Sequence, residues 1–238
     1  MADWVQVAVP SVESAPATAV SDARRLIACL GNLSVARERN AQKRSEPPPP
    51  DMLAGKAVVL RPLRVADRIK SMRWRNDPDV RDGILGYRFP VTEEMEADWV
   101  DAVLKDQSRT RVVLAIEDKT DSALVGFVYL NNIDWFARNA EFGMLIGERD
   151  RQGKGLARET LELVANYAFG TLNLHKIYLR VVAFNKRALN LYRTFGFAEE
   201  GIQRQQAFLR ERYHDVVLMG LLRRELERRR AGRKFHSG

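Results

Sequence analysis

Two glycines and a lysine stand directly before a helical pattern in the stretch RQGKGLARETLELVANYAFG, Arg151 to Gly170. A helix N-terminus exposes unpaired N–H groups and carries partial positive charge, and glycine lets the backbone approach a ligand closely. The combination is typical of a phosphate-binding loop, although a glycine turn that merely starts a helix is the alternative. Arg151 and Lys154 can add point charge to a nest of backbone amides. The predicted nest comprises Gln152, Gly153, Lys154, Gly155, Leu156 and Ala157.

Two common phosphate loops do not fit this stretch. The Walker loop requires Ser or Thr after its lysine, and here Gly155 follows Lys154. The dinucleotide fingerprint requires a third glycine where Arg158 stands. The pattern Gln/Arg-x-x-Gly-x-Gly/Ala is met by Gln152, Gly155 and Ala157. This pattern resembles the pyrophosphate loop of the GNAT family of acetyl-CoA-dependent N-acetyltransferases.

Further segments carry the same resemblance. The stretch NKRALNLYRTFGF, Asn185 to Phe197, is similar to the family's second cofactor segment, Asn-x-x-Ala-x-x-x-Tyr-x-x-x-Gly-Phe. Upstream, NAEFGMLIG resembles the family's central strand, and the order of elements agrees from about residue 53 to 222. The short motifs LRPL, AEFG, LNL and GFAEEG resemble those of the branch that holds ribosomal-protein N-terminal, spermidine and amino-sugar N-acetyltransferases. These motifs do not indicate which acceptor of that branch the protein uses.

The resemblance implies acetyl-CoA as a co-substrate and no metal ion. The backbone of Met144, Leu145 and Ile146 would pair with pantetheine like an extra strand, while their side chains belong to the core. Asn185 and Arg187, in the second segment, would contact the cofactor. Asn185 also suits the N-cap of its helix, and both roles stay open.

Two residues are candidates for moving protons. The resemblance makes Tyr192 the acid that protonates the leaving thiolate, because a thiol pKa of about 8.5 and a phenol pKa of about 10 are close. A packed tyrosine with a satisfied hydroxyl is the alternative. Glu141 begins the central strand, where a carboxylate is costly unless it is used or paired. It is a candidate general base acting through water, or else a structural hydrogen-bond partner of the neighbouring strand.

The acceptor cleft of family members is built from the first two helices and the last hairpin. Arginines beside aromatic residues in the first of these segments suit a nucleotide diphosphate, and the wording WRNDP resembles amino-sugar nucleotide acetyltransferases. Tyr129, Asn131 and Asn132 end a predicted strand and could orient the acceptor. The basic and aromatic residues concerned are Arg73, Arg75, Arg81 and Arg88 with Trp74 and Tyr87.

The next helical segment is acidic, as a polyamine enzyme would require. These acids crowd the first turns of the helix, where its dipole already favours them, so a solvated face is the preferred interpretation. A protein N-terminus is a third acceptor class, since its amine is easily deprotonated. The acids are Glu93, Glu94, Glu96, Asp98 and Asp101.

Between residues 51 and 222 the hydrophobic pattern predicts an α/β fold, a mixed sheet with helices packed on it. The resemblance implies that this is the GNAT fold, in which the sheet is mostly antiparallel. The predicted order is β-α-α-β-β-β-α-β-α-β-β. The acidic helix should begin at the N-cap Thr92 and bury Met95, Trp99, Val103 and Leu104. The preceding helix should place Ile69, Met72 and either Arg73 or Trp74 at helical spacing, and Gly196 should end the helix that carries Tyr192.

The charge of +8 is concentrated near one end of the chain. Residues 1–50 carry six Lys/Arg and five Asp/Glu, whereas residues 223–238 carry seven and two. We expect residues 1–50, which end in SEPPPP, to lack fixed structure. Residues 223–238 should form a basic tail that is the solvated end of a helix. Because residues 51–222 carry a net charge of only +2, nucleic-acid binding is not the expected main activity.

Composition excludes several further classes of site. A single cysteine, Cys29, rules out an intrachain disulfide framework, and three scattered histidines offer no metal spacing. No apolar run is long enough to span a membrane, and we expect a cytoplasmic enzyme for which a homodimer is one open assembly. A non-catalytic acetyl-CoA-binding module is the alternative to an enzyme. The intact loop glycines and Tyr192 favour catalysis.

Overall fold

The computed structural model describes residues 53–86 and 88–234 of the 238-residue chain. Its centre is an eight-stranded sheet in the order β1-β2-β3-β4-β5-β6-β8-β7. Every neighbouring pair is antiparallel except β5 and β6, so the predicted mixed, mostly antiparallel sheet is confirmed. The strands are β1 (Leu53–Ala54), β2 (Val58–Pro62), β3 (Val112–Asp118), β4 (Ala123–Asp134), β5 (Asn139–Ile146), β6 (Lys176–Val182), β7 (Ala198–Leu209) and β8 (Arg212–Leu222).

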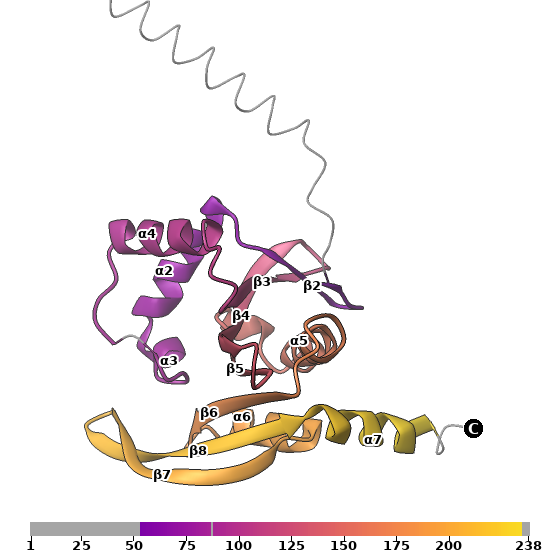
Figure 1. Cartoon of the computed structure of the whole chain (residues 1–238). Coiled ribbons are helices and arrows are strands. Elements are labelled where there is room, and N and C mark those ends of the chain that lie inside the picture. The colour runs from indigo at the N-terminus through magenta and orange to yellow at the C-terminus, as the bar shows by residue number, and fades with distance from the viewer. Residues whose placement is uncertain (1–52, 87, 235–238) are drawn as a thin grey trace, which may run out of the picture. The chain divides into compact units, whose positions relative to one another are not determined.

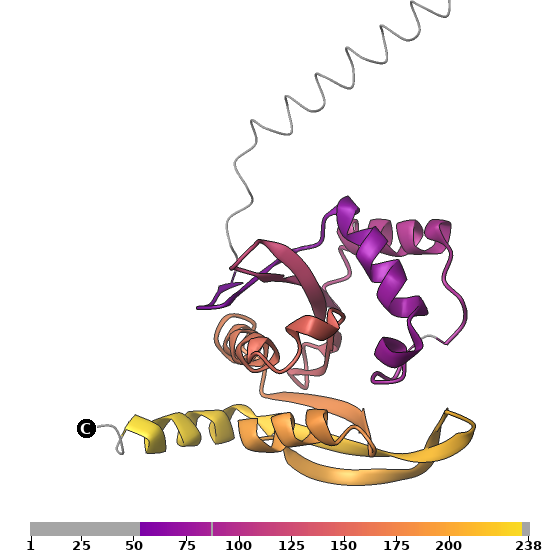
Figure 2. The same cartoon turned by 180° about the vertical axis from the view of Figure 1, so that it is seen from behind.

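Helices pack on both faces of the sheet (Figures 1 and 2). The larger core joins α5 and α6 to the face that carries Phe142 and Ile177, and a smaller core joins α2, α3 and α4 to the face that carries Phe127 and Leu145. The helices are α2 (Arg68–Asn76), α3 (Pro78–Arg81), α4 (Glu93–Leu104), α5 (Leu156–Asn166), α6 (Lys186–Phe195) and α7 (Arg223–Lys234). Short turns of other helix types are η1 (Val65–Asp67), η2 (Arg149–Arg151) and η3 (Tyr167–Thr171).

The predicted helix boundaries at three polar or glycine residues are confirmed. Thr92 caps α4 by accepting a hydrogen bond from the backbone N–H of Met95, and Asn185 caps α6 by accepting one from Ala188. Gly196 ends α6 with a φ of 129°, a value that L side chains rarely adopt. Because these caps fix where α6 begins, they also fix which residues of α6 face the sheet.

The buried faces of α2 and α4 differ from the predicted ones. Met95 and Leu104 are exposed, and α4 instead buries Glu96 and Val100. The solvated-face interpretation is therefore wrong for Glu96, whose carboxylate lies near the guanidinium of Arg75 on α2. The apolar pattern missed this face because a carboxylate beside a cation on another helix can be buried at tolerable cost.

The other correction on this side concerns α2. Ile69 is exposed, whereas Ser71 and Trp74 are buried. Trp74 packs edge-on against Phe127 of β4, so its ring belongs to the core and not to an acceptor cleft. The helix α2 therefore packs on the sheet through the face that carries Ser71 and Trp74 and not through Ile69.

The two parallel strands pair over only a short stretch. β5 and β6 are joined from Asn139 to Glu141 on one strand and from Lys176 to Tyr178 on the other. Beyond Glu141, β5 continues to Ile146 with β4 as its partner, but no pairing with β6 continues. The strands therefore form a fork, and one edge of residues 142–146 is open for an extended ligand.

Some predictions concern residues that the structure does not describe. These are the prediction for residues 1–50, which include Cys29, and the one for Tyr87. The segment expected to be a basic tail continues β8 as α7, and Leu226 of that helix is buried in the larger core. Arg230 of α7 donates a hydrogen bond to Asn166 of α5. Three arginines of α7, Arg223, Arg229 and Arg230, therefore make intramolecular contacts.

Candidate active site

The predicted phosphate loop joins the open end of β5 to α5. Gly153 and Gly155 have φ values of 84° and 85°, the left-handed conformation that glycine adopts without strain. Within the described residues, no acceptor is bonded to the backbone N–H groups of residues 153–157. A Cβ atom built at Gly155 would meet nothing within 4 Å. The loop thus presents unpaired amides to open space at the start of a helix, as an anion site requires.

The side chain of Gln152 holds the loop in place, whereas that of Lys154 makes no contact among the described residues that would hold it. Gln152 donates a hydrogen bond to the carbonyl of Ile146 (3.0 Å) and accepts one from Arg187 of α6 (2.8 Å). Lys154 is exposed and makes no ion pair or hydrogen bond within the described part of the chain. Its ammonium group is therefore available to a phosphate.

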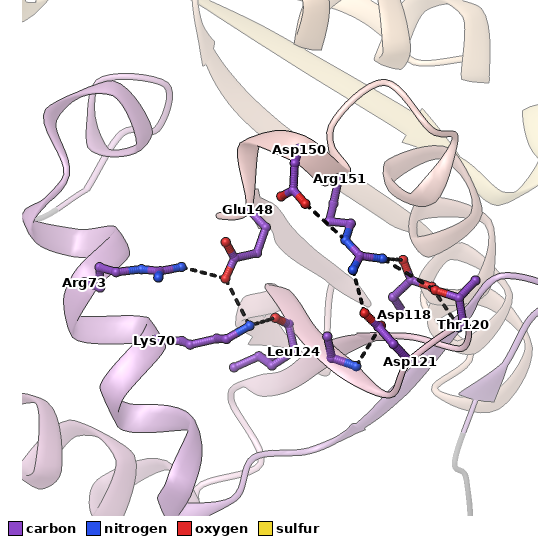
Figure 3. A network of polar contacts seen from close by, with 10 residues as sticks. Lys70, Arg73, Asp118, Thr120, Asp121, Leu124, Glu148, Asp150 and Arg151 are labelled. Carbon is purple, nitrogen blue, oxygen red and sulfur yellow. Dashed lines mark hydrogen bonds and ion pairs between the residues drawn. The ribbon is translucent and has the colours of Figure 1, made fainter.

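Arg151 points away from the loop into a cluster of acids (Figure 3). It donates hydrogen bonds to Asp118 (2.8 Å) and Asp121 (2.5 Å), at the turn between β3 and β4. Asp118 is buried, and hydrogen bonding from Thr120 together with the Arg151 guanidinium holds its pKa below the ordinary value. The cofactor role predicted for Arg151 stays a prediction, and its visible contacts are those of a brace.

A second ion pair braces the same region from α2. Glu148, at the end of β5, lies 2.6 Å from Arg73 and 3.0 Å from Lys70, both on α2 (Figure 3). Arg73, which the sequence placed in the acceptor cleft, thus lies against the loop. The loop is anchored on one side to α2 and on the other to the β3–β4 turn.

These contacts predict opposite effects for two cations of the loop. Arg151→Met should lower the free energy of unfolding by about 1–3 kcal/mol, since it leaves the buried Asp118 carboxylate without its cation. Lys154→Met should leave stability unchanged and weaken acetyl-CoA binding several-fold. Thermal denaturation and calorimetric titration of both variants check this. The reverse assignment, with Lys154 needed for stability, would contradict the prediction.

A cavity of about 440 Å³ lies beside the fork, between α2, α3 and α4 on one side and α6 on the other. Tyr192 and Glu141, which lie far apart in the sequence, both line it. Met144 and Leu145 border it from β5, and Asn185 from the start of α6. The cavity thus brings together the two predicted proton-transfer residues and part of the predicted cofactor strand.

Tyr192 enters the cavity from α6. Its ring packs edge-on against Phe142, with a centroid distance of 6.2 Å, and at a tilt against Phe197, with a centroid distance of 5.6 Å. Its hydroxyl makes no hydrogen bond within the described residues. Burial raises the pKa of Tyr192 above its ordinary value, so the phenol is protonated at neutral pH. The ring is fixed by packing while the hydroxyl is left for a ligand.

Glu141 lies at the point where β5 and β6 separate. Its carboxylate accepts hydrogen bonds from Arg180 of β6 (2.8 Å) and from Asn132 of β4 (3.1 Å). The position of Glu141 suits both predicted roles, general base and structural hydrogen-bond partner, because its carboxylate is bonded to the neighbouring strands and also borders the cavity. The roles of Glu141 and Tyr192 in catalysis stay predictions.

Residues 57–198 match the family model described as an acetyltransferase (GNAT) domain. This chain belongs to the GNAT acetyltransferase family. It is accordingly an N-acetyltransferase that uses acetyl-CoA, as the resemblance implied. No metal-holding group of His, Cys, Asp and Glu side chains occurs among the described residues, and no helix there is long and apolar enough to cross a bilayer.

Relatives within the family include spermidine N(1)-acetyltransferases. The chain is 33% identical to that of Escherichia coli over 171 residues, which cover 71% of this chain and 87% of the relative. It is 40% identical to that of Vibrio cholerae over 119 residues, 50% of this chain and 66% of the relative. A solved structure of the Vibrio cholerae enzyme with CoA and spermine superposes with a TM-score of 0.67 at 29% identity, covering 73% of this chain and 99% of that one.

In this GNAT enzyme, the wall of the cavity opposite Tyr192 is rich in arginine. Arg111 and Arg180 are held by protein acceptors, the former by Asp106 and by a backbone carbonyl. Arg75 and Arg81 make no side-chain hydrogen bond within the residues described. Of the predicted arginines, all of which the structure describes, Arg75 and Arg81 line the cavity, whereas Arg88 donates its hydrogen bonds to the backbone carbonyls of Arg81 and Ile84.

Several residues of this wall were not singled out from the sequence. Arg111 lies directly before β3 and Arg180 lies on β6, and neither was predicted to belong to a site, while Trp99 was assigned to an apolar stripe. Tyr129 and Asn131, which were predicted to orient an acceptor, do line the cavity. Burial raises the pKa of Tyr129 to about 12, so its phenol is neutral in the physiological range.

Proposed function

We propose that this enzyme transfers acetyl from CoA directly to a primary amine of a small molecule that also carries an anionic group. An amino-sugar nucleotide is such a molecule. The supporting observation is the charge of the cavity wall. Among the described lining residues Glu141 is the only acid, and Arg180 already neutralises it. Arg75 and Arg81 each lie near a carboxylate behind the wall, Glu96 and Asp82, but their guanidinium groups make no hydrogen bond among the described residues and keep donors for a ligand. An anion on the acceptor would satisfy them.

The proposed chemistry is a single displacement. The pantetheine arm of CoA lies along the open edge of β5, and the pyrophosphate of CoA lies at the loop amides. The acceptor nitrogen attacks the thioester carbonyl, the C–S bond breaks, and the thiolate takes the proton of Tyr192. The proton lost by the nitrogen passes through water to Glu141. Burial raises the pKa of the Tyr192 phenol, so the phenol carries its proton when the thiolate forms.

Glu141→Gln tests the base. The amide keeps the shape of the side chain but cannot take a proton, so kcat/KM should fall by roughly 10²–10⁴-fold near neutral pH. The loss should shrink at high pH, where the acceptor amine is already neutral. Glu199→Gln, which alters an arginine-paired strand carboxylate outside the cavity, is the matched control. A wild-type pH–rate profile in Glu141→Gln would move the base elsewhere, first to a water held by Asn131 or Asn132.

A polyamine is the second candidate acceptor, because a relative that this chain matches over 87% of the relative's length is named a spermidine acetyltransferase. The arginines in the cavity oppose a polycation, and Glu141 has an arginine partner. A protein N-terminus is a third acceptor without a specific supporting contact. Self-association as a homodimer also stays a prediction.

Thiol release from acetyl-CoA distinguishes these acceptors. The assay compares glucosamine 6-phosphate, an amino-sugar nucleotide, spermidine and a peptide with a free N-terminus. We expect the anionic amines to give a kcat/KM at least roughly tenfold above that of spermidine, the effect of one favourable charged contact. A preference for spermidine would overturn the proposed acceptor class, and no stimulation by any amine would favour a non-catalytic module.

A further inference from the structure

Glu96 carries a buried charge that the proposed reaction does not use. Its side chain is 1% exposed, and neither carboxylate oxygen has a hydrogen-bond partner. Its ion-pair partner among the described residues is Arg75, whose Nε lies 3.4 Å away. Burying a carboxylate with so little satisfaction is unfavourable, and an apolar residue at this position of α4 would pack without that cost.

What Glu96 does achieve is to fix Arg75. The guanidinium of Arg75 lies 4.3 Å from the ring centroid of Trp99, also on α4, so one face is stacked while one edge meets Glu96. Both contacts restrict the side chain without occupying the Nη donors. Arg75 and Trp99 line the cavity, whereas Glu96 lies behind them. The result is an immobilised planar cation with free N–H groups beside the acceptor space.

We propose that Arg75 is the specificity-determining residue for the acceptor, binding its phosphate or carboxylate, and that Glu96 and Trp99 are positioning residues that hold it. This inference rests on the proposed function and names the contact behind it. A guanidinium suits the role because its planar fork can bind two oxygens of one anion, which an ammonium group cannot do in the same geometry. Stacking on Trp99 reduces the side-chain entropy lost on binding.

The test compares two acceptors that differ by one anion, glucosamine 6-phosphate and glucosamine. In Arg75→Met the KM for glucosamine 6-phosphate should rise roughly 10–100-fold, the effect of losing a charged hydrogen-bond donor. The kcat for glucosamine 6-phosphate, and both the kcat and the KM for glucosamine, should stay unchanged. Arg75→Lys should recover little, because it restores the charge without the fork. Glu96→Gln keeps the volume and removes the ion pair, so it should raise the same KM by a smaller factor.

Arg68→Met is the matched control, since Arg68 lies on the same helix but pairs with the exposed Glu93 and does not line the cavity. It should leave all constants unchanged. An equal change for both sugars in Arg75→Met, or full recovery in Arg75→Lys, would overturn the assignment while leaving acetyl transfer intact. Failure of the wild-type enzyme to acetylate any amine would instead overturn the proposed function.

Discussion

Gly155→Val is expected to abolish acetyl-CoA binding while the protein stays folded. The physical reason is that the space in front of Gly155 holds no protein atom within 4 Å, so an added side chain meets only the pyrophosphate. The substitution also places a β-branched residue at a φ of 85°, which should cost about 1–2 kcal/mol of folding stability. Calorimetric titration with acetyl-CoA measures the affinity, and thermal denaturation measures the stability.

A second variant separates strain from steric exclusion. Gly155→Asn tolerates a left-handed backbone but still places a Cβ in the phosphate space, so it too should lose binding. Gly170→Ala is the control, because a Cβ there also meets nothing and lies far along the chain from the loop. Unchanged affinity in both Gly155 variants would show that the pyrophosphate binds elsewhere.

Tyr192→Phe should reduce kcat by roughly 10²–10⁴-fold, the usual cost of losing a positioned proton donor. The change removes one oxygen that has no hydrogen-bond partner in the described structure, and the ring contacts with Phe142 and Phe197 persist. Stability and acetyl-CoA affinity should therefore stay close to wild type, because the lost interaction forms as the thiolate leaves. Single-turnover kinetics and a melting curve check both parts.

The control for this variant is Tyr167→Phe, which alters a partly buried tyrosine that packs on the same core outside the cavity. It should leave kcat unchanged. Wild-type turnover by Tyr192→Phe with an accepted amine would remove Tyr192 from the mechanism. A loss of acetyl-CoA affinity equal to the loss of rate would instead make its hydroxyl a ground-state cofactor contact.

Much of the backbone structure around the predicted cofactor loop could be predicted from the sequence because its signals are local. The glycines of the loop, the cap at Asn185 and the stop at Gly196 each act within a few residues of their own position. Tyr192 follows Asn185 along one helix, so its direction was set once the cap was known. These features depend on backbone geometry that the residue types themselves impose.

The acceptor side could not be predicted in the same way, since its contacts join distant segments. Glu96 is buried because Arg75 of another helix lies beside it, and no pattern within α4 contains that information. Arg151 has the sequence position of a phosphate ligand, but its partners come from the turn after β3. Charge on a residue indicates neither burial nor partner until the tertiary structure is known.

The fork between β5 and β6 has a consequence for the lifetime of the protein. Only three residue pairs join the two strands, which leaves a seam beyond Glu141 where β5 and β6 do not pair with each other. A cofactor that fills the seam binds the native state and not the unfolded chain, and it adds stability that grows with the logarithm of its free concentration. The resistance of the enzyme to unfolding and degradation would then follow the supply of acetyl-CoA, so that abundance is coupled to the metabolite it consumes.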